Sequence, residues 1–215
     1  MPQILLALDL HSFETAFVTL LFVVEPLGLA PIFLAATRGF DASARWRIAL
    51  RACLFALLIL TGTALAGGRL LTALGISLPA FRVAGGLLLF AIAAEMTLGV
   101  RIEREARAAR QAVEEHIHEV AVFPLAIPLM AGPGAIAATL LLAERAQGDT
   151  PALAALAAAI AAVIAICLAV YALAGPIGRV LGASGNLVLA KVLGLLLAAL
   201  AVQYVADGAL ALLRE

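Results

Sequence analysis

Two short stretches of this sequence place helix breakers inside long apolar runs. The first reads EPLG, at Glu25–Gly28, and the second reads GPG, at Gly132–Gly134. Proline lacks a backbone N–H and clashes with the preceding helical turn, and glycine adopts conformations that other residues avoid. Each stretch therefore predicts a helix that stops and restarts, with free carbonyls where it stops and free amides where it restarts. Two such breaks facing each other can bind a small anion, such as a carboxylate, together with a cation or an ammonium group.

The carboxylate of Glu25 is the group best suited to chemistry at the first break. A carboxylate at mid-depth in a bilayer costs about 2.5–3.5 kcal/mol on insertion scales, so it should face a cavity or a partner. We expect it to carry a proton, to coordinate a cation or to pair with a substrate ammonium. The predicted substrate- and ion-binding residues are Glu25, Pro26, Gly28, Gly132, Pro133, Gly134 and Thr139. Two alternatives stay open: the breaks are packing kinks, and the Thr139 hydroxyl bonds to its own helix.

The elements that must position these residues are membrane-spanning helices. Hydrophobic residues make up 65% of the 215-residue chain and charged residues 13%, whereas soluble domains have about 45–50% and about 25%. A helix needs about 20 apolar residues to cross a bilayer. Six segments fit: Phe13–Ala36, Ile48–Ala73, Ala80–Val100, Val120–Ala143, Ala152–Leu173 and Leu187–Leu213. The predicted fold is an all-α membrane protein of six transmembrane helices, two of them broken.

An internal repeat relates the two breaks. The matched positions include, at an offset of 107, Pro26 with Pro133 and Gly75 with Gly182, and, at an offset of 109, Arg82 with Lys191. Each half holds three spans, an odd number, so the two halves enter the membrane in opposite senses. The sequence therefore predicts a 3+3 inverted-topology repeat, as in many secondary transporters. Residues 1–100 form the first repeat, 101–119 a polar cytoplasmic connection and 120–215 the second repeat. The pair Gly85–Gly86 also predicts close helix packing.

Basic residues near the span ends predict the orientation. Lys and Arg gather in cytoplasmic loops, and the odd-numbered loops hold most of them, including Arg38, Arg45, Arg101 and Arg104. The odd loops should then be cytoplasmic, and both termini should face away from the cytoplasm. Four further charges near span ends are expected at the membrane interface: Arg82, Glu95, Lys191 and Asp207.

Several function classes are disfavoured. The formal net charge of +0 provides no basic footprint for nucleic acid. No nucleophile triad, phosphate loop or metal cluster is evident, so we expect neither an enzyme nor a bound cofactor. His116 and His118 lack a third ligand for a metal. Cys53 and Cys167 lie far apart in apolar runs, as buried structural cysteines do. The expected partners are a small-molecule substrate and the lipid bilayer.

Three segments resemble the MarC family of bacterial inner-membrane proteins. They read PLGLAPIF, GISLPAFRVAGGLLLFAIAAEM and VFPLAIPLMAGPGAIA, and the likeness covers almost the whole chain. The resemblance implies six spans, a bacterial inner-membrane location and kinship with transporters of small neutral amino acids such as glycine and alanine. The chain departs from the family pattern at Glu25 and Leu29, where the family usually has Asn. We expect the Glu25 carboxylate to favour H+ over Na+ as the coupling ion, and the apolar Leu29 to make the substrate pocket smaller or drier.

The predicted function is a secondary transporter that moves a small neutral amino acid by alternating access, coupled to H+ or Na+. Two alternatives stay open. One is an exporter of another small metabolite or drug-like solute, and the other is a non-transporting membrane scaffold in which the breaks are only kinks. Both a monomer and a homo-oligomer are compatible with the sequence.

Overall fold

The structure, a computed structural model, describes residues 2–101, 104, 107, 121–146 and 149–214. Every regular element in these ranges is a helix, which confirms the predicted all-α class. In chain order the elements are α1 (Pro2–Val24), α2 (Pro26–Ala36), α3 (Ala42–Ala73), α4 (Leu78–Leu98), η1 (Ala121–Met130), α6 (Pro133–Arg145), α7 (Thr150–Ala172) and α8 (Ala174–Leu212). The connection predicted at 101–119, with His116 and His118, lies almost entirely outside the described residues.

Five helical stretches in the described part of the chain are long and apolar enough to cross a membrane. They are Leu10–Ala36 (α1 and α2 together), Ala42–Ala73, Leu78–Leu98, Thr150–Ala172 and Ser184–Leu212. The predicted fourth span corresponds instead to η1 and α6, of 10 and 13 residues. Each is too short by itself for about 30 Å of hydrocarbon. Large apolar side chains, for example Leu58, Leu65 and Val188, are more than half exposed on the long helices. Exposed apolar surface of this kind is typical of contact with lipid.

A side-chain cap sets the start of α3. The Asp41 carboxylate accepts hydrogen bonds from the Ser43 hydroxyl at 2.8 Å and from the Ala44 N–H at 3.1 Å. These two bonds lower the pKa of Asp41 below its usual value. The cap extends the helix through a polar first turn, so α3 begins at Ala42 and not at the predicted Ile48.

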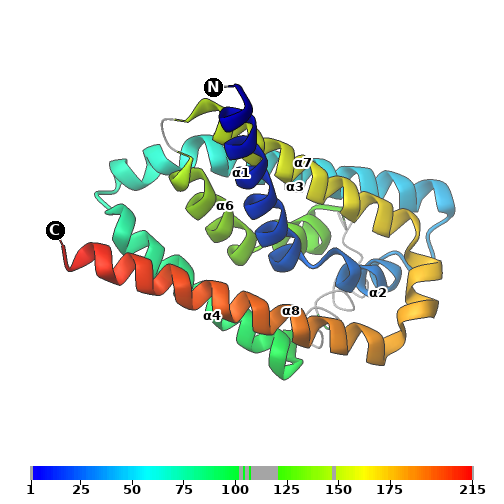
Figure 1. The fold of residues 1–215 in the computed structure, drawn as a ribbon. Helices are drawn as coiled ribbons and strands as arrows, with labels where there is room; N and C mark the ends of the chain where they lie inside the picture. Colours follow the sequence, from blue (N-terminus) through cyan, green and yellow to red (C-terminus); the bar gives the residue numbers. More distant parts are fainter. Residues whose placement is uncertain (1, 102–103, 105–106, 108–120, 147–148, 215) are drawn as a thin grey trace.

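The helices form two long pairs with the broken helices between them (Figure 1). α3 packs along α7 on one side, and α4 packs along α8 on the other. α1 contacts α7, and η1 contacts α3. α2 and α6 each contact both pairs. The broken helices therefore lie between the two long pairs, and α2 and α6 contact long helices on both sides.

Glycines allow α4 and α8 to approach closely, as the pair Gly85–Gly86 predicted. A Cβ atom on Gly86 would lie 2.7 Å from Val205 Cγ2 and 2.9 Å from the Ala201 carbonyl oxygen. On the facing helix, a Cβ atom on Gly194 would lie 3.0 Å from the Ala93 carbonyl oxygen. Backbones this close gain van der Waals contact, which is a main source of helix association in lipid.

Candidate functional site

The first break separates α1 from α2 at Glu25. This residue has φ 52° and ψ 62°, and it is the only non-glycine residue with positive φ among those described. The Glu25 N–H still donates to the Leu21 carbonyl at 3.0 Å. Pro26 has no N–H for the Phe22 carbonyl, and α2 starts at this proline as predicted. A left-handed non-glycine residue carries strain of about 1–3 kcal/mol, which the surrounding fold must hold.

The Glu25 side chain is buried and folds back onto the start of α2. The residue is 5% exposed. A Cβ atom on Gly28 would lie 3.3 Å from Glu25 Cδ and 3.4 Å from Oε1, so Gly28 leaves the carboxyl the space it occupies. The partial positive charge at a helix N-terminus stabilises a nearby anion. The break thus holds a carboxylate against a helix start inside the protein.

The second break has a different geometry. η1 is π-helical, and the Ala131 N–H donates at 2.8 Å to the Ala126 carbonyl, five residues back. Gly132 is extended, with φ −79° and ψ 174°, and α6 starts at Pro133 as predicted. π-helical segments are rare and occur frequently at functional sites. Both predicted breaks are therefore present, and the π-helix before the second is a feature that the sequence did not indicate.

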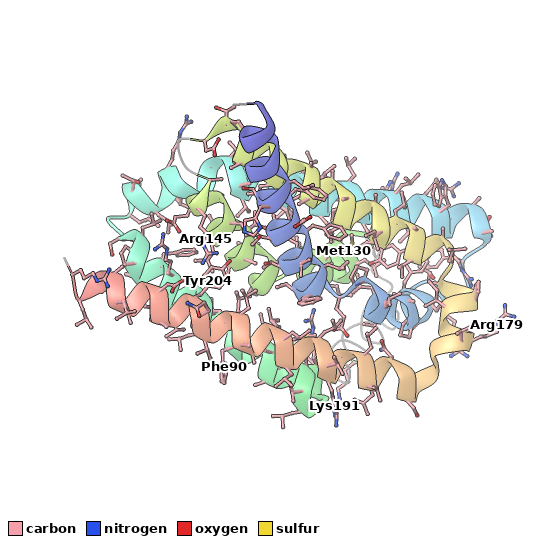
Figure 2. All side chains as sticks on the ribbon, viewed as in Figure 1. Phe90, Met130, Arg145, Arg179, Lys191 and Tyr204 are labelled. Atoms are coloured by element: carbon pink, nitrogen blue, oxygen red, sulfur yellow. The ribbon has the colours of Figure 1, made fainter. Side chains whose placement is uncertain are left out.

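The two breaks are neighbours in space. A Cβ atom on Gly134 would lie 3.3 Å from Val23 Cγ1, near the end of α1, and 2.5 Å from Ile92 Cδ1 of α4. Glycine allows the second half-helix to approach the first this closely. Met130, the last residue of η1, is fully buried and lies in the middle of the bundle (Figure 2). The end of α1 and the start of α6 therefore form one continuous region.

Thr139 lies nearly two turns into α6 and is the predicted site residue furthest along its helix from a break. Its side chain is 0% exposed, and its hydroxyl has no hydrogen-bond partner among the described residues. The Thr37 hydroxyl, by contrast, donates to the Phe33 carbonyl of its own helix at 2.7 Å. A buried donor without a partner costs about 1–3 kcal/mol, so the Thr139 hydroxyl is a candidate to bind a water, an ion or a substrate. Of the other predicted residues, Pro26, Gly132 and Gly134 are buried and Pro133 is exposed.

Arg101 belongs to this region, although the sequence assigned it to the polar connection. The residue is 7% exposed, and its Nη2 donates to the Val23 carbonyl at 3.3 Å. That carbonyl is among the last four of α1, which have no regular amide partner within the helix. Charge counting places an arginine near a span end at the membrane surface. An arginine at a span end has the same local sequence pattern whether its side chain faces the membrane surface or the protein interior, so the sequence did not indicate the buried position of Arg101.

A second polar group, the ionic cluster, joins α4, α6 and α8. Arg82 binds Glu144 through two hydrogen bonds, of which Nε to Oε2 measures 2.8 Å. Arg145 lies 3.5 Å from Asp207 and stacks over the Tyr204 ring, 4.7 Å from its centroid (Figure 2). We expected Arg82 and Asp207 at the membrane interface, and the structure adds that both pair with residues of α6. No local signal identifies Glu144, because its partner lies 62 residues away.

Two cavities lie at opposite ends of α3. The first has a volume of about 680 Å³ and is lined by the segment 64–73 of α3, the end of α6 and the start of α7. The second has a volume of about 500 Å³ and is lined by the segment 42–49, the end of α2 and the end of α7. In the second cavity Phe33 stacks on Tyr171, with ring centroids 4.4 Å apart. The helices that line both cavities also flank the two breaks.

A sequence family described as MarC family integral membrane protein matches residues 10–213. The chain belongs to the MarC family. A relative from Archaeoglobus fulgidus, named UPF0056 membrane protein, is 39% identical over 93% of this chain and 92% of its own. A protein of the same name from Aquifex aeolicus is 35% identical, with 94% of each chain covered. UPF0056 membrane protein YhcE from Escherichia coli is 34% identical, with 93% of each chain covered.

No solved structure matches the chain. Membership of the MarC family and the long apolar helices together show an integral, multi-pass membrane protein.

Proposed function

We propose that this MarC family protein is a secondary transporter that moves a small neutral amino acid across the inner (plasma) membrane by alternating access. The observation that carries the proposal is the meeting of two interrupted helices beside the buried Glu25, with Gly134 against Val23. In many secondary transporters, half-helix N-termini and freed carbonyls form the substrate and ion sites in this way.

The helix contacts support an inverted repeat of three spans and three spans. In this scheme α1, α2 and α4 correspond to η1, α6 and the later part of α8, and α3 corresponds to α7 with the start of α8. Under this correspondence, helix contacts form equivalent pairs. The contact of α1 with α7 corresponds to that of η1 with α3, and the contact of α2 with α8 corresponds to that of α6 with α4. The contacts of α3 with α7 and of α4 with α8 join the two halves, and each corresponds to itself when the halves are interchanged. Gly75 and Gly182, which match at the offset of 107, both have positive φ, 68° and 57°.

The two cavities support the same correspondence. Five lining residues of the first match five of the second at the offset of 107: Ala64 with Tyr171, Leu65 with Ala172, Gly68 with Gly175, Asp149 with Ala42 and Leu153 with Trp46. α3 has 32 residues, and such a helix is about 48 Å long. Equivalent cavities at its two ends therefore fit a transporter in which either end opens in turn to a site between them.

The chemistry at the breaks favours a small zwitterion. The Glu25 carboxylate can pair with a substrate ammonium, and the amides at a half-helix start can bind a substrate carboxylate. Val23 and Ile92 pack closely against Gly134, because a Cβ atom there would lie 3.3 Å from Val23 Cγ1 and 2.5 Å from Ile92 Cδ1. These apolar neighbours favour a small substrate side chain, such as that of glycine or alanine, over a bulky one.

Uptake into proteoliposomes tests the proposal. The wild-type protein should take up glycine or alanine with a rate that depends on pH, and Glu25→Gln should change this dependence because it removes the titrating group. The matched control is Glu95→Gln, since Glu95 pairs with Arg104 at a more exposed position. Flat pH profiles in both wild type and Glu25→Gln would remove the proton-carrier role. Transport of amphiphilic solutes without amino acids would identify an exporter, and transport of neither would leave the scaffold alternative.

A further inference from the structure

Arg101 occupies the place where a transporter with broken helices would coordinate a cation. In such proteins, freed backbone carbonyls and half-helix C-terminal ends coordinate the coupling Na+ or H+. In this protein, the corresponding carbonyl of Val23 accepts a hydrogen bond from Arg101 Nη2 at 3.3 Å. A positive charge is therefore already present at the C-terminal end of α1.

The end of α1 suits a cation for two reasons. The partial negative charge of a helix C-terminus stabilises a positive group. The final carbonyls also need partners: that of Leu21 accepts from the Glu25 N–H at 3.0 Å, and that of Phe22 faces a proline without N–H. The Val23 carbonyl comes next, and the buried Arg101 binds it.

We propose that Arg101 is a tethered cation that takes the position of a coupling sodium ion, so that this protein works without sodium. The proposal rests on the proposed function, because it assigns the coupling-ion subsite of the same site. The guanidinium is a cation attached to the chain, so the position is supplied with charge without an ion from solution. A sodium ion reaching the Val23 carbonyl would meet this like charge at short range. Of the two coupling ions expected from the sequence, H+ and Na+, this leaves H+.

Removal of the Arg101 charge should convert the region into a sodium site. Arg101→Gln leaves the Glu25 carboxylate two residues from the Val23 carbonyl. Carboxylate and carbonyl oxygens are the ligands that hard cations prefer. Arg101→Lys keeps a positive charge of similar reach, so it should behave like wild type. These two variants separate the effect of charge from the effect of altered packing.

Thermal unfolding in detergent provides a test that does not depend on transport. Tm is measured in sodium chloride and in choline chloride at equal ionic strength. Wild type, Arg101→Lys and the control Arg104→Gln, which alters an exposed pair with Glu95, should have the same Tm in both salts. The Tm of Arg101→Gln should be about 3–6 °C higher in sodium chloride than in choline chloride, when sodium is present at about ten times the dissociation constant of the sodium complex.

Two results would overturn the proposal. One is a sodium-specific rise in the Tm of the wild-type protein, and the other is a folded Arg101→Gln protein that is indifferent to sodium. If Arg101→Gln is not recovered folded, the Tm of the wild-type protein is measured during a sodium titration. A constant Tm supports the proposal, and a sodium-specific rise in Tm contradicts it. Because the readout is ion binding, a wild-type protein that fails to transport amino acids would contradict the proposed function and leave this test intact.

Discussion

The ion pair between Arg82 and Glu144 predicts a specific loss of stability when one partner is removed. The Glu144 side chain is 7% exposed and that of Arg82 is 26% exposed, and two hydrogen bonds join them across α4 and α6. Glu144→Leu leaves the guanidinium without its partner. Breaking a buried pair costs about 3–5 kcal/mol, and we expect about 2–3 kcal/mol here because part of Arg82 reaches the surface and stays solvated.

Two buried cysteines supply the assay. Cys53 and Cys167 are free and are 5% and 0% exposed, so a thiol-reactive fluorescent dye reaches them only when the protein unfolds. For a chain of this size, 1 kcal/mol shifts Tm by about 2–4 °C, so Glu144→Leu should lower Tm by about 4–12 °C. All variants are heated at one fixed rate, because the apparent Tm of an irreversible transition depends on scan rate.

A double variant and a matched control complete the test. Arg82→Met combined with Glu144→Leu should recover more than half of the loss, because an apolar pair of similar volume often replaces a buried ion pair at little cost. Glu95→Gln breaks a pair whose side chains are 59% and 32% exposed, and it should cost less than about 1 kcal/mol. Equal losses from Glu144→Leu and Glu95→Gln, or an additive loss in the double variant, would refute the reasoning.

Two further predictions concern helix packing and orientation. Gly86→Ala should destabilise by about 1–3 kcal/mol because the new methyl group meets Val205 and the Ala201 carbonyl. Gly62→Ala should stabilise α3 by about 0.5–1 kcal/mol, because no side chain and no other helix lies within 4 Å of its Cβ position. Changes of the same sign in the thermal assay would contradict the close approach of α4 and α8. If the predicted orientation is right, a phosphatase fused after residue 215 should be active and a fluorescent protein fused there dark, because the arginine distribution predicts a C-terminus outside the cytoplasm. If the fluorescent-protein fusion is fluorescent and the phosphatase fusion is inactive, the predicted orientation is wrong.

The two breaks could be predicted because their causes are local. α2 and α6 begin at Pro26 and Pro133, where the sequence placed them, since a proline removes a donor and restricts φ whatever surrounds it. The start of α3 was predicted less well, because the Asp41 cap continues the helix through a polar turn that hydropathy excludes. The π-helical form of η1 was not predicted, because a change of hydrogen-bond register depends on how the segment packs.

The sequence by itself determined that this chain is an integral membrane protein and where its helices break, because hydropathy and proline geometry are properties of neighbouring residues. Only the tertiary structure decided the partners of its buried polar groups. It pairs Arg82 with Glu144 and Arg101 with the Val23 carbonyl, across 62 and 78 positions of sequence. An arginine at a span end has the same local pattern whether it faces lipid headgroups or a buried acceptor. The packing of α4 against the broken helices is what distinguishes the two.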